Sequence, residues 1–201
     1  MILNLCMDEL EKEVKLCRYL LGKYADIINE HERRTIREIK ELVDGTDLSI
    51  QSIINDFKDP SYSFQEDYLS VLKKVFEYVQ KEINFVDADL NVNYWFSPKE
   101  IIEAKVADDE DIAIFLCALM KGLGDSRAEV IIAELDDLKT HAFVITEFKE
   151  DFILLDPAQK KPFETFIGKK QEVLRNYSFK EQKIKRFLYR FNSEKYEQFL
   201  E

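Results

Sequence analysis

The stretch Ala107-Asp108-Asp109-Glu110-Asp111 leads directly into an apolar run at residues 112–120. The run is long and apolar enough to form a buried helix. Carboxylates are favoured in the first turn of a helix, by roughly 0.3 to 1 kcal/mol, because unpaired N–H groups and the helix dipole concentrate positive charge there. We therefore expect a helix at residues 109–121 that presents the side chain of Asp109 at its N-terminal end.

Three strands are expected after this helix. Residues 128–135, 140–148 and 152–156 are rich in β-branched and aromatic residues, and turn-like polar segments separate them. They predict an antiparallel meander packed on the helix. This arrangement would bring His141, near the start of the second strand, and Asp156, at the end of the third, close to Asp109.

The motifs His141-Ala142-Phe143-Val144 and Leu154-Leu155-Asp156-Pro157, together with residues 107–111, resemble those of the transglutaminase-like superfamily of the papain-like cysteine peptidase clan. In that family a Gly-Asp-Cys-x-Asp segment opens the helix, a His-Ala strand follows, and an Asp-Pro closes the next strand. The resemblance covers residues 69–163, about half of the chain. It implies an α+β fold with the helix packed on an antiparallel sheet, and it implies that Asp109 occupies the position of the catalytic cysteine.

A second departure from the family lies upstream, in Tyr94-Trp95-Phe96-Ser97-Pro98-Lys99-Glu100. Many prokaryotic members carry glutamine where this chain has Phe96, and that amide resembles an oxyanion-hole donor. Phenylalanine cannot donate to an oxyanion, and loss of one such donor typically costs roughly a hundredfold to a thousandfold in rate. Loss of the nucleophile ends covalent acyl transfer altogether. The resemblance therefore implies a pseudoenzyme with degenerate triad positions at Asp109, His141 and Asp156 and a lost oxyanion donor at Phe96.

The three cysteines do not replace the missing nucleophile. Cys117 lies about 12 Å along the predicted helix from its start, on a face that is predicted to be buried. Cys6 and Cys17 fall in the N-terminal helical region and are interpreted as small apolar residues. Scattered cysteines make neither a disulfide framework nor a zinc module. No run of eighteen apolar residues is present, and residues 1–7 lack the basic and apolar regions of a signal peptide, so we expect none. We expect a cytoplasmic protein that does not enter a membrane.

Two functions remain open from the sequence. In the preferred one, Asp109 accepts a hydrogen bond from His141 in a structural cluster with Asp156, and the domain is a non-catalytic scaffold that binds a protein or peptide. It would need no cofactor and no metal. The alternative is a hydrolase or metal-dependent enzyme of altered mechanism, in which the same three residues act as base or nucleophile, or as the ligands of a divalent metal.

The distribution of charge along the chain indicates which classes of binding partner to expect. The net charge is −11, yet residues 159–201 carry eleven basic and six acidic side chains. The preferred interpretation is that this basic tail packs on the acidic body or that its charges simply solvate its own helices. The alternative is a basic face for RNA or an acidic partner, but no nucleic-acid-binding motif supports it, so we do not expect nucleic-acid binding.

The first 58 residues are predicted to be mainly helical. Apolar residues recur every three or four positions, which predicts helices at residues 8–29, around 35–43 and up to residue 57, before Asp59-Pro60 breaks the chain. We expect a helical segment at residues 1–58, which either closes the core of the adjacent domain or docks a partner, and a transglutaminase-like domain at residues 59–201. The remaining expected elements are helices at 64–82, 98–104 and 193–200 and a strand at 183–191.

Overall fold

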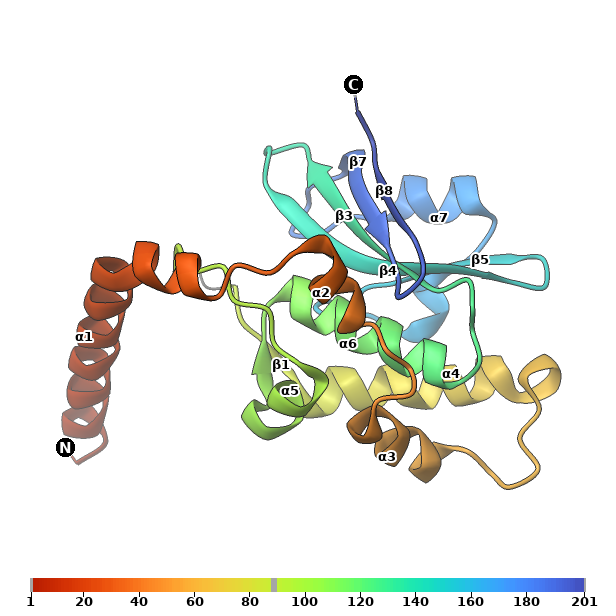
Figure 1. The fold of residues 1–201 in the computed structure, drawn as a ribbon, viewed down its shortest axis with the longest axis horizontal. Coiled ribbons are helices and arrows are strands. Elements are labelled where there is room, and N and C mark those ends of the chain that lie inside the picture. Colours follow the sequence, from red (N-terminus) through yellow and green to blue (C-terminus); the bar gives the residue numbers. More distant parts are fainter. Residues whose placement is uncertain (1, 88–89, 201) are drawn as a thin grey trace.

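A computed structural model describes residues 2–87 and 90–200, with the backbone alone for residues 2–8. It has the expected α+β architecture, in which a twisted antiparallel sheet covers a layer of helices (Figure 1). The strands of this sheet lie in the order β6-β5-β4-β3-β7-β8. In the described chain they are β3 (Glu129–Leu135), β4 (Thr140–Phe148), β5 (Asp151–Leu155), β6 (Ile167–Gly168), β7 (Ile184–Phe191) and β8 (Tyr196–Gln198).

The helices begin and end close to where the sequence predicts. Those before the sheet are α1 (Ile2–His31), α2 (Ile36–Glu41), α3 (Leu48–Phe57), α4 (Phe64–Glu82), α5 (Pro98–Ala104) and α6 (Asp109–Gly122). The bounds of α4 and α5 match the prediction. Ser97 caps α5 because its hydroxyl accepts from the Glu100 N–H while the Glu100 carboxylate accepts from the Ser97 N–H. Two short strands, β1 (Asn84–Phe85) and β2 (Val106–Ala107), pair in parallel just before α6.

The core forms around α6. Every residue from Asp111 to Met120 is buried, because the helix is covered by β3 and β4 on one side and by α3 and α4 on the other. Leu42, Val43, Ile50 and Ile54 belong to the same apolar cluster. The loop and helix after α2 thus help to close the core, as one of the two interpretations predicts. The N-terminal turns of α1, by contrast, extend away from the body (Figure 1). The domain boundary after residue 58 stays a prediction.

The predicted C-terminal helix at residues 193–200 is wrong. The Asn192 side chain is buried, and its Oδ1 accepts from the backbone N–H groups of Glu194 and Lys195, both at 2.9 Å. This turn reverses the chain, so that Tyr196 pairs with Phe191 and β8 forms the edge of the sheet. The prediction also omitted a 3-10 turn (Phe163–Phe166) and the helix α7 (Lys170–Asn176), which packs beside β5.

The basic tail packs on the acidic body, which is one of the two arrangements that the preferred interpretation allowed. Arg186 on β7 forms an ion pair with Glu134 on β3 at 2.8 Å, and Arg190 approaches Glu129 at 3.8 Å. Lys180 pairs with Asp87 in the loop after β1. Among the described residues, no helix has both the length and the apolar composition that a membrane span requires.

Candidate functional site

The site begins at the first turn of α6, where the chain turns from β2 into the helix. Asp108 is the N-cap, and its Oδ1 accepts from the Asp111 N–H at 2.9 Å. Asp109 follows as the first helical residue, with its side chain turned towards β4. Its Oδ2 accepts from the backbone N–H of Ala142 at 2.7 Å, which ties the start of the helix to the sheet.

His141 lies between two carboxylates. Its Nδ1 is 2.8 Å from Oδ2 of Asp109, and its Nε2 is 2.9 Å from Oδ2 of Asp156. The ring is 1% exposed. Burial by itself lowers the pKa of His141, but the hydrogen bonds to Asp109 and Asp156 outweigh it and raise the pKa to about 9. The ring is therefore an imidazolium at neutral pH, with both N–H groups donating.

Asp156 is fully buried and accepts from several donors besides His141. Its Oδ2 accepts from the Tyr177 hydroxyl and from the Gln159 amide, each at 2.7 Å, and its Oδ1 accepts from the Ala158 N–H at 3.1 Å. These contacts compensate the carboxylate for the loss of water. Sequence reasoning did not single out Gln159 or Tyr177. The only signal for Tyr177 was an aromatic residue in a tail that was expected to pack on the body.

Phe179 caps the histidine. Its ring stacks on the imidazole with 3.6 Å between centroids and 11° between planes. Phe85 packs edge-on against Phe179, and the ion pair between Lys180 and Asp87 lies over the same entrance. The cleft that these residues leave beside Asp109 and His141 has a volume of about 70 Å³. Such a space holds a water molecule or two but no substrate side chain of ordinary size.

Phe96 lies outside this cleft. Its backbone N–H donates to Oδ1 of Asp111 at 2.9 Å, and its ring packs edge-on against Tyr94. The ring lines a neighbouring pocket of about 470 Å³, together with Asp108 and the α1 residues Leu21 and Ile28. Phe96 therefore brings no side chain to the cleft beside His141, which Phe179 caps.

The first turn of α6 concentrates negative charge. Carboxylate oxygens of Asp108, Asp109 and Glu110 all lie within 4.8 Å of one another. Burial first, and then the charges of Asp109 and Asp108, raise the pKa of Glu110 to about 8. Burial and the charge of Asp108 likewise raise the pKa of Asp111 to about 8. These acids share a confined space and resist simultaneous ionisation.

The cysteines are remote from this chemistry. Cys117 is fully buried in the core, as predicted, and burial raises the pKa of its thiol far above the ordinary value. Cys17 is free and exposed on α1. The side chain of Cys6 lies outside the described residues.

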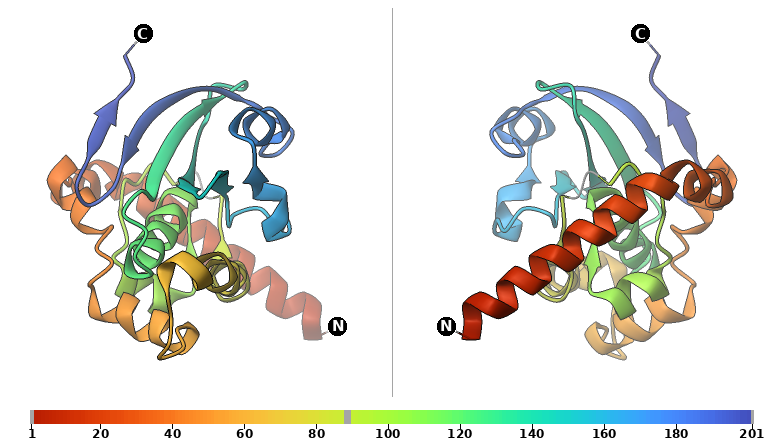
Figure 2. Two further views of the ribbon diagram at one scale, coloured as in Figure 1. Left: turned by 90° about the vertical axis from the view of Figure 1, so that its right-hand side faces the viewer. Right: turned by 90° about the vertical axis from the view of Figure 1, so that its left-hand side faces the viewer.

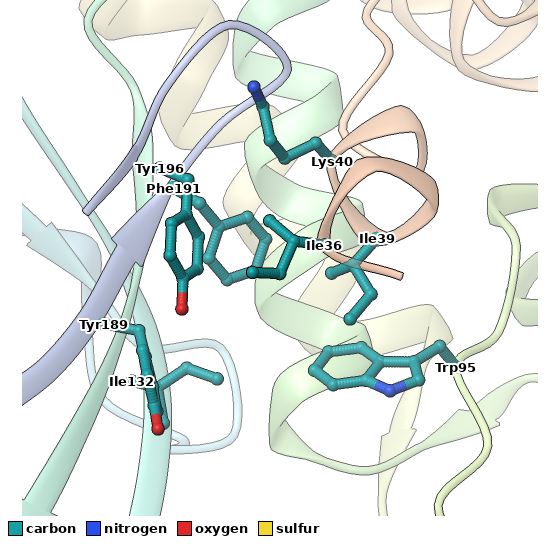
Figure 3. Close-up of a pocket in the computed structure, with 8 residues that line it drawn as sticks. All are labelled: Ile36, Ile39, Lys40, Trp95, Ile132, Tyr189, Phe191 and Tyr196. Atoms are coloured by element: carbon teal, nitrogen blue, oxygen red, sulfur yellow. The ribbon is translucent and has the colours of Figure 1, made fainter. Parts of the chain in front are cut away.

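A separate apolar pocket lies where α2 meets the sheet (Figure 3). Its volume is about 200 Å³. In Figure 3 the indole of Trp95 forms its floor, with Tyr189 and Tyr196 of the β7–β8 hairpin on one side and Ile36 and Ile39 of α2 on the other. The space is large enough for one or two apolar side chains of a partner.

The geometry restricts what the three predicted site residues can do. All three meet, as the sequence predicts. However, both ring nitrogens of His141 donate to carboxylates, so neither carries a lone pair for a metal or for accepting a proton. The arrangement also keeps Asp156 behind the histidine, away from Asp109, which does not correspond to the three-ligand face of a metal triad.

Comparison with solved structures supports the fold. Calcium-bound LapG of Legionella pneumophila superposes with a TM-score of 0.51 at 18% sequence identity, covering 82% of this chain and 88% of LapG. The EGTA-treated form of LapG has the same score and identity and covers 84% and 87% of the two chains. No family model and no curated protein matches the sequence. The chain thus shares its α+β fold with LapG, and a likeness at this identity shows the fold alone.

Proposed function

We propose that this chain is a non-catalytic transglutaminase-like domain that binds a protein or peptide, with Asp109 in place of the nucleophilic cysteine. The observation that carries the proposal is the position of the Asp109 carboxylate on Nδ1 of His141, at 2.8 Å. In the family that the sequence resembles, a thiol must meet the histidine there. Here an ion pair occupies the site and holds the ring protonated, so it stabilises the fold and has no base to activate a nucleophile.

Binding is better supported outside the degenerate cleft than inside it. The cleft of about 70 Å³ is capped by Phe179, whereas the pocket above Trp95 has about 200 Å³ and an apolar lining. Tyr196 belongs to the edge strand β8, so a partner segment lying along this edge can insert an apolar side chain into the pocket. Free thiols at Cys17 and Cys117 fit the cytoplasm as the site of action.

One experiment separates the scaffold from an enzyme of altered mechanism. Purified protein and the Asp109→Ala variant are assayed side by side against amide, ester and transamidation substrates. We expect no turnover above buffer for either protein. Turnover by the wild type that disappears in a folded Asp109→Ala variant would establish the hydrolase alternative instead.

A second experiment tests binding. Peptides selected from a displayed library on the wild-type protein are titrated against Tyr196→Ala, which truncates the pocket, and against Tyr19→Ala on α1. Both tyrosines are solvent-exposed, at 37% and 66%, so neither change threatens the fold. We expect Tyr196→Ala to weaken binding about tenfold or more and Tyr19→Ala to leave it unchanged. Selected peptides that bind both variants equally would place the binding surface elsewhere.

Cation binding is a second candidate function, favoured by the crowding of carboxylates at Asp108, Asp109 and Glu110. Oxygen ligands of this kind suit Ca²⁺. Burial is the main cause of the raised pKa of Glu110, and a cation would relieve the repulsion from Asp109 and Asp108 that adds to it. The similar LapG structure is described as calcium-bound. Calorimetric titration with Ca²⁺ should then show saturable binding and a raised melting temperature, both lost in Glu110→Gln. No heat and no thermal shift would rule the site out.

A further inference from the structure

Helix α1 carries an apolar stripe that the rest of the described chain leaves largely uncovered. The stripe follows the alternating four- and three-residue spacing of a coiled coil, at Leu10, Val14, Cys17, Leu21, Tyr24 and Ile28. Leu10 is 60% and Val14 44% exposed, and Cys17 is exposed as well. These N-terminal turns extend beyond the body of the molecule (Figures 1 and 2). In the sequence the same spacing continues to Leu3 and Met7.

Nearer the body, the stripe borders an open space. Leu21 and Ile28 line the pocket of about 470 Å³, and Val86, Val92 and Tyr94 form its other wall. Leu21 and Ile28 thus belong both to the stripe and to the wall of this pocket. Exposed apolar surface of this kind marks a site of interaction with another element.

The residues flanking the stripe indicate what covers it. Val14, Leu21 and Ile28 take the first core position of the heptad, and Leu10, Cys17 and Tyr24 take the second. Val14 and Ile28 at the first position are β-branched, and Leu10 at the second is a leucine. Such residues at these positions favour a pair of parallel helices. In a parallel, in-register pair, Glu13 of one copy lies opposite Arg18 of the other. The stripe is thus flanked by charges that complement those of a second copy.

We propose that two copies of this chain associate through a parallel, in-register coiled coil of α1. The contact is independent of the degenerate triad, and it places two transglutaminase-like bodies at one end of a shared helical stem. The partner helix covers the apolar stripe and closes the pocket beside Leu21 and Ile28.

Sedimentation velocity of the full chain over a concentration series tests the proposal, with two matched lysine variants. Leu10 lies in the seam and is 60% exposed, whereas Leu16 lies on the same helix outside the seam and is 58% exposed. We expect a wild-type dimer, a dissociation constant raised at least about a hundredfold by Leu10→Lys, and no change with Leu16→Lys. A wild-type monomer at every concentration, or equal weakening by both variants, would overturn the proposal.

Charge exchange tests the parallel register. Glu13→Arg should weaken the dimer about threefold to tenfold, because the substituted side chain brings a second positive charge opposite Arg18 of the other copy. The double variant Glu13→Arg with Arg18→Glu should restore the wild-type constant. A double variant that stays as weak as the single one would contradict the parallel arrangement. Circular dichroism of each variant confirms that the body remains folded.

Discussion

Oδ2 of Asp109 lies 2.8 Å from Nδ1 of His141, at the point where the resembling family requires a thiol. The same oxygen accepts from the Ala142 N–H, so the start of α6 and the start of β4 are joined through one carboxylate. A side chain that a catalytic scaffold would use for chemistry therefore fastens two elements of the fold.

Removing this carboxylate should destabilise the protein. Asp109→Ala leaves the Ala142 N–H and Nδ1 of buried His141 without their partner, which we expect to lower the free energy of unfolding by about 2 kcal/mol. Urea denaturation at neutral pH measures the loss. Asp137→Ala is the control, because Asp137 lines the same cleft but is exposed. Equal stability of the two variants would show that the pair with His141 contributes nothing.

Restoring a thiol should not restore acyl transfer. In Asp109→Cys the sulfur would face His141, but Phe179 still caps the cleft and Phe96 offers no side-chain donor to an oxyanion. We expect no peptidase or transglutaminase turnover from this variant, measured with the substrates used for the wild type. Full activity from the single change would contradict the view that the chain lacks more than one feature needed for catalysis.

The sequence predicted the helices and strands of the core better than the elements at the edge of the sheet. The helices α4, α5 and α6 and the meander of β3, β4 and β5 have strong periodicity, because each buries a continuous apolar face. Residues 193–200 misled the prediction, since the apolar spacing of Tyr196, Phe199 and Leu200 fits a helix. The turn made by Asn192 depends on its burial next to Ala128, which no local pattern reveals.

At the candidate site, too, the sequence predicted the residues on the core elements and missed those that the C-terminal tail brings in. Its motifs predicted the meeting of Asp109, His141 and Asp156, because the helix start and two strand ends carry them. Phe179, Tyr177 and Gln159 were missed, since they reach the site only through the path of the tail. Phe96 was placed correctly along the chain, but its side chain points to a different pocket, and this depends on the packing of Tyr94 and α1.

Stability should fall as the pH rises from about 5 to about 9. Glu110 keeps its proton in the folded protein up to about pH 8, whereas an unfolded glutamate loses it near 4.5, so folding binds protons throughout that window. His141 contributes in the same direction: its stabilisation is fully present below about 6.5 and is lost as the pH rises through about 9. Both groups therefore favour the folded state at lower pH.

Glu110→Gln removes the contribution of Glu110 and leaves those of His141 and of Asp111, whose pKa is also raised to about 8. The amide cannot ionise, so the variant should be more stable than the wild type at pH 9 by at least about 1 kcal/mol and should show a shallower pH dependence. Urea denaturation at several pH values provides the measurement. A parallel pair of pH curves would mean that Glu110 does not titrate with a raised pKa.

Gly45 tests how the segment between α2 and α3 packs on α6. A Cβ at this position would lie 2.6 Å from the backbone carbonyl carbon of Lys121, which cannot move without disturbing the end of the buried helix. Gly45→Ala should therefore cost about 1 to 3 kcal/mol of unfolding free energy. Gly22→Ala on α1, which meets nothing within 4 Å, is the control and should not destabilise. Equal effects would mean that the segment does not pack against α6.

The protonation state of His141 tests the central claim most directly. Long-range ¹H–¹⁵N spectra of histidine-labelled protein report each ring nitrogen, and substitution of His31 assigns the second signal. We predict an imidazolium, protonated at both nitrogens, that persists until the pH approaches about 9. A ring that loses its proton near 6.5 and leaves one nitrogen bare at neutral pH would provide a general base, and it would contradict the non-catalytic account.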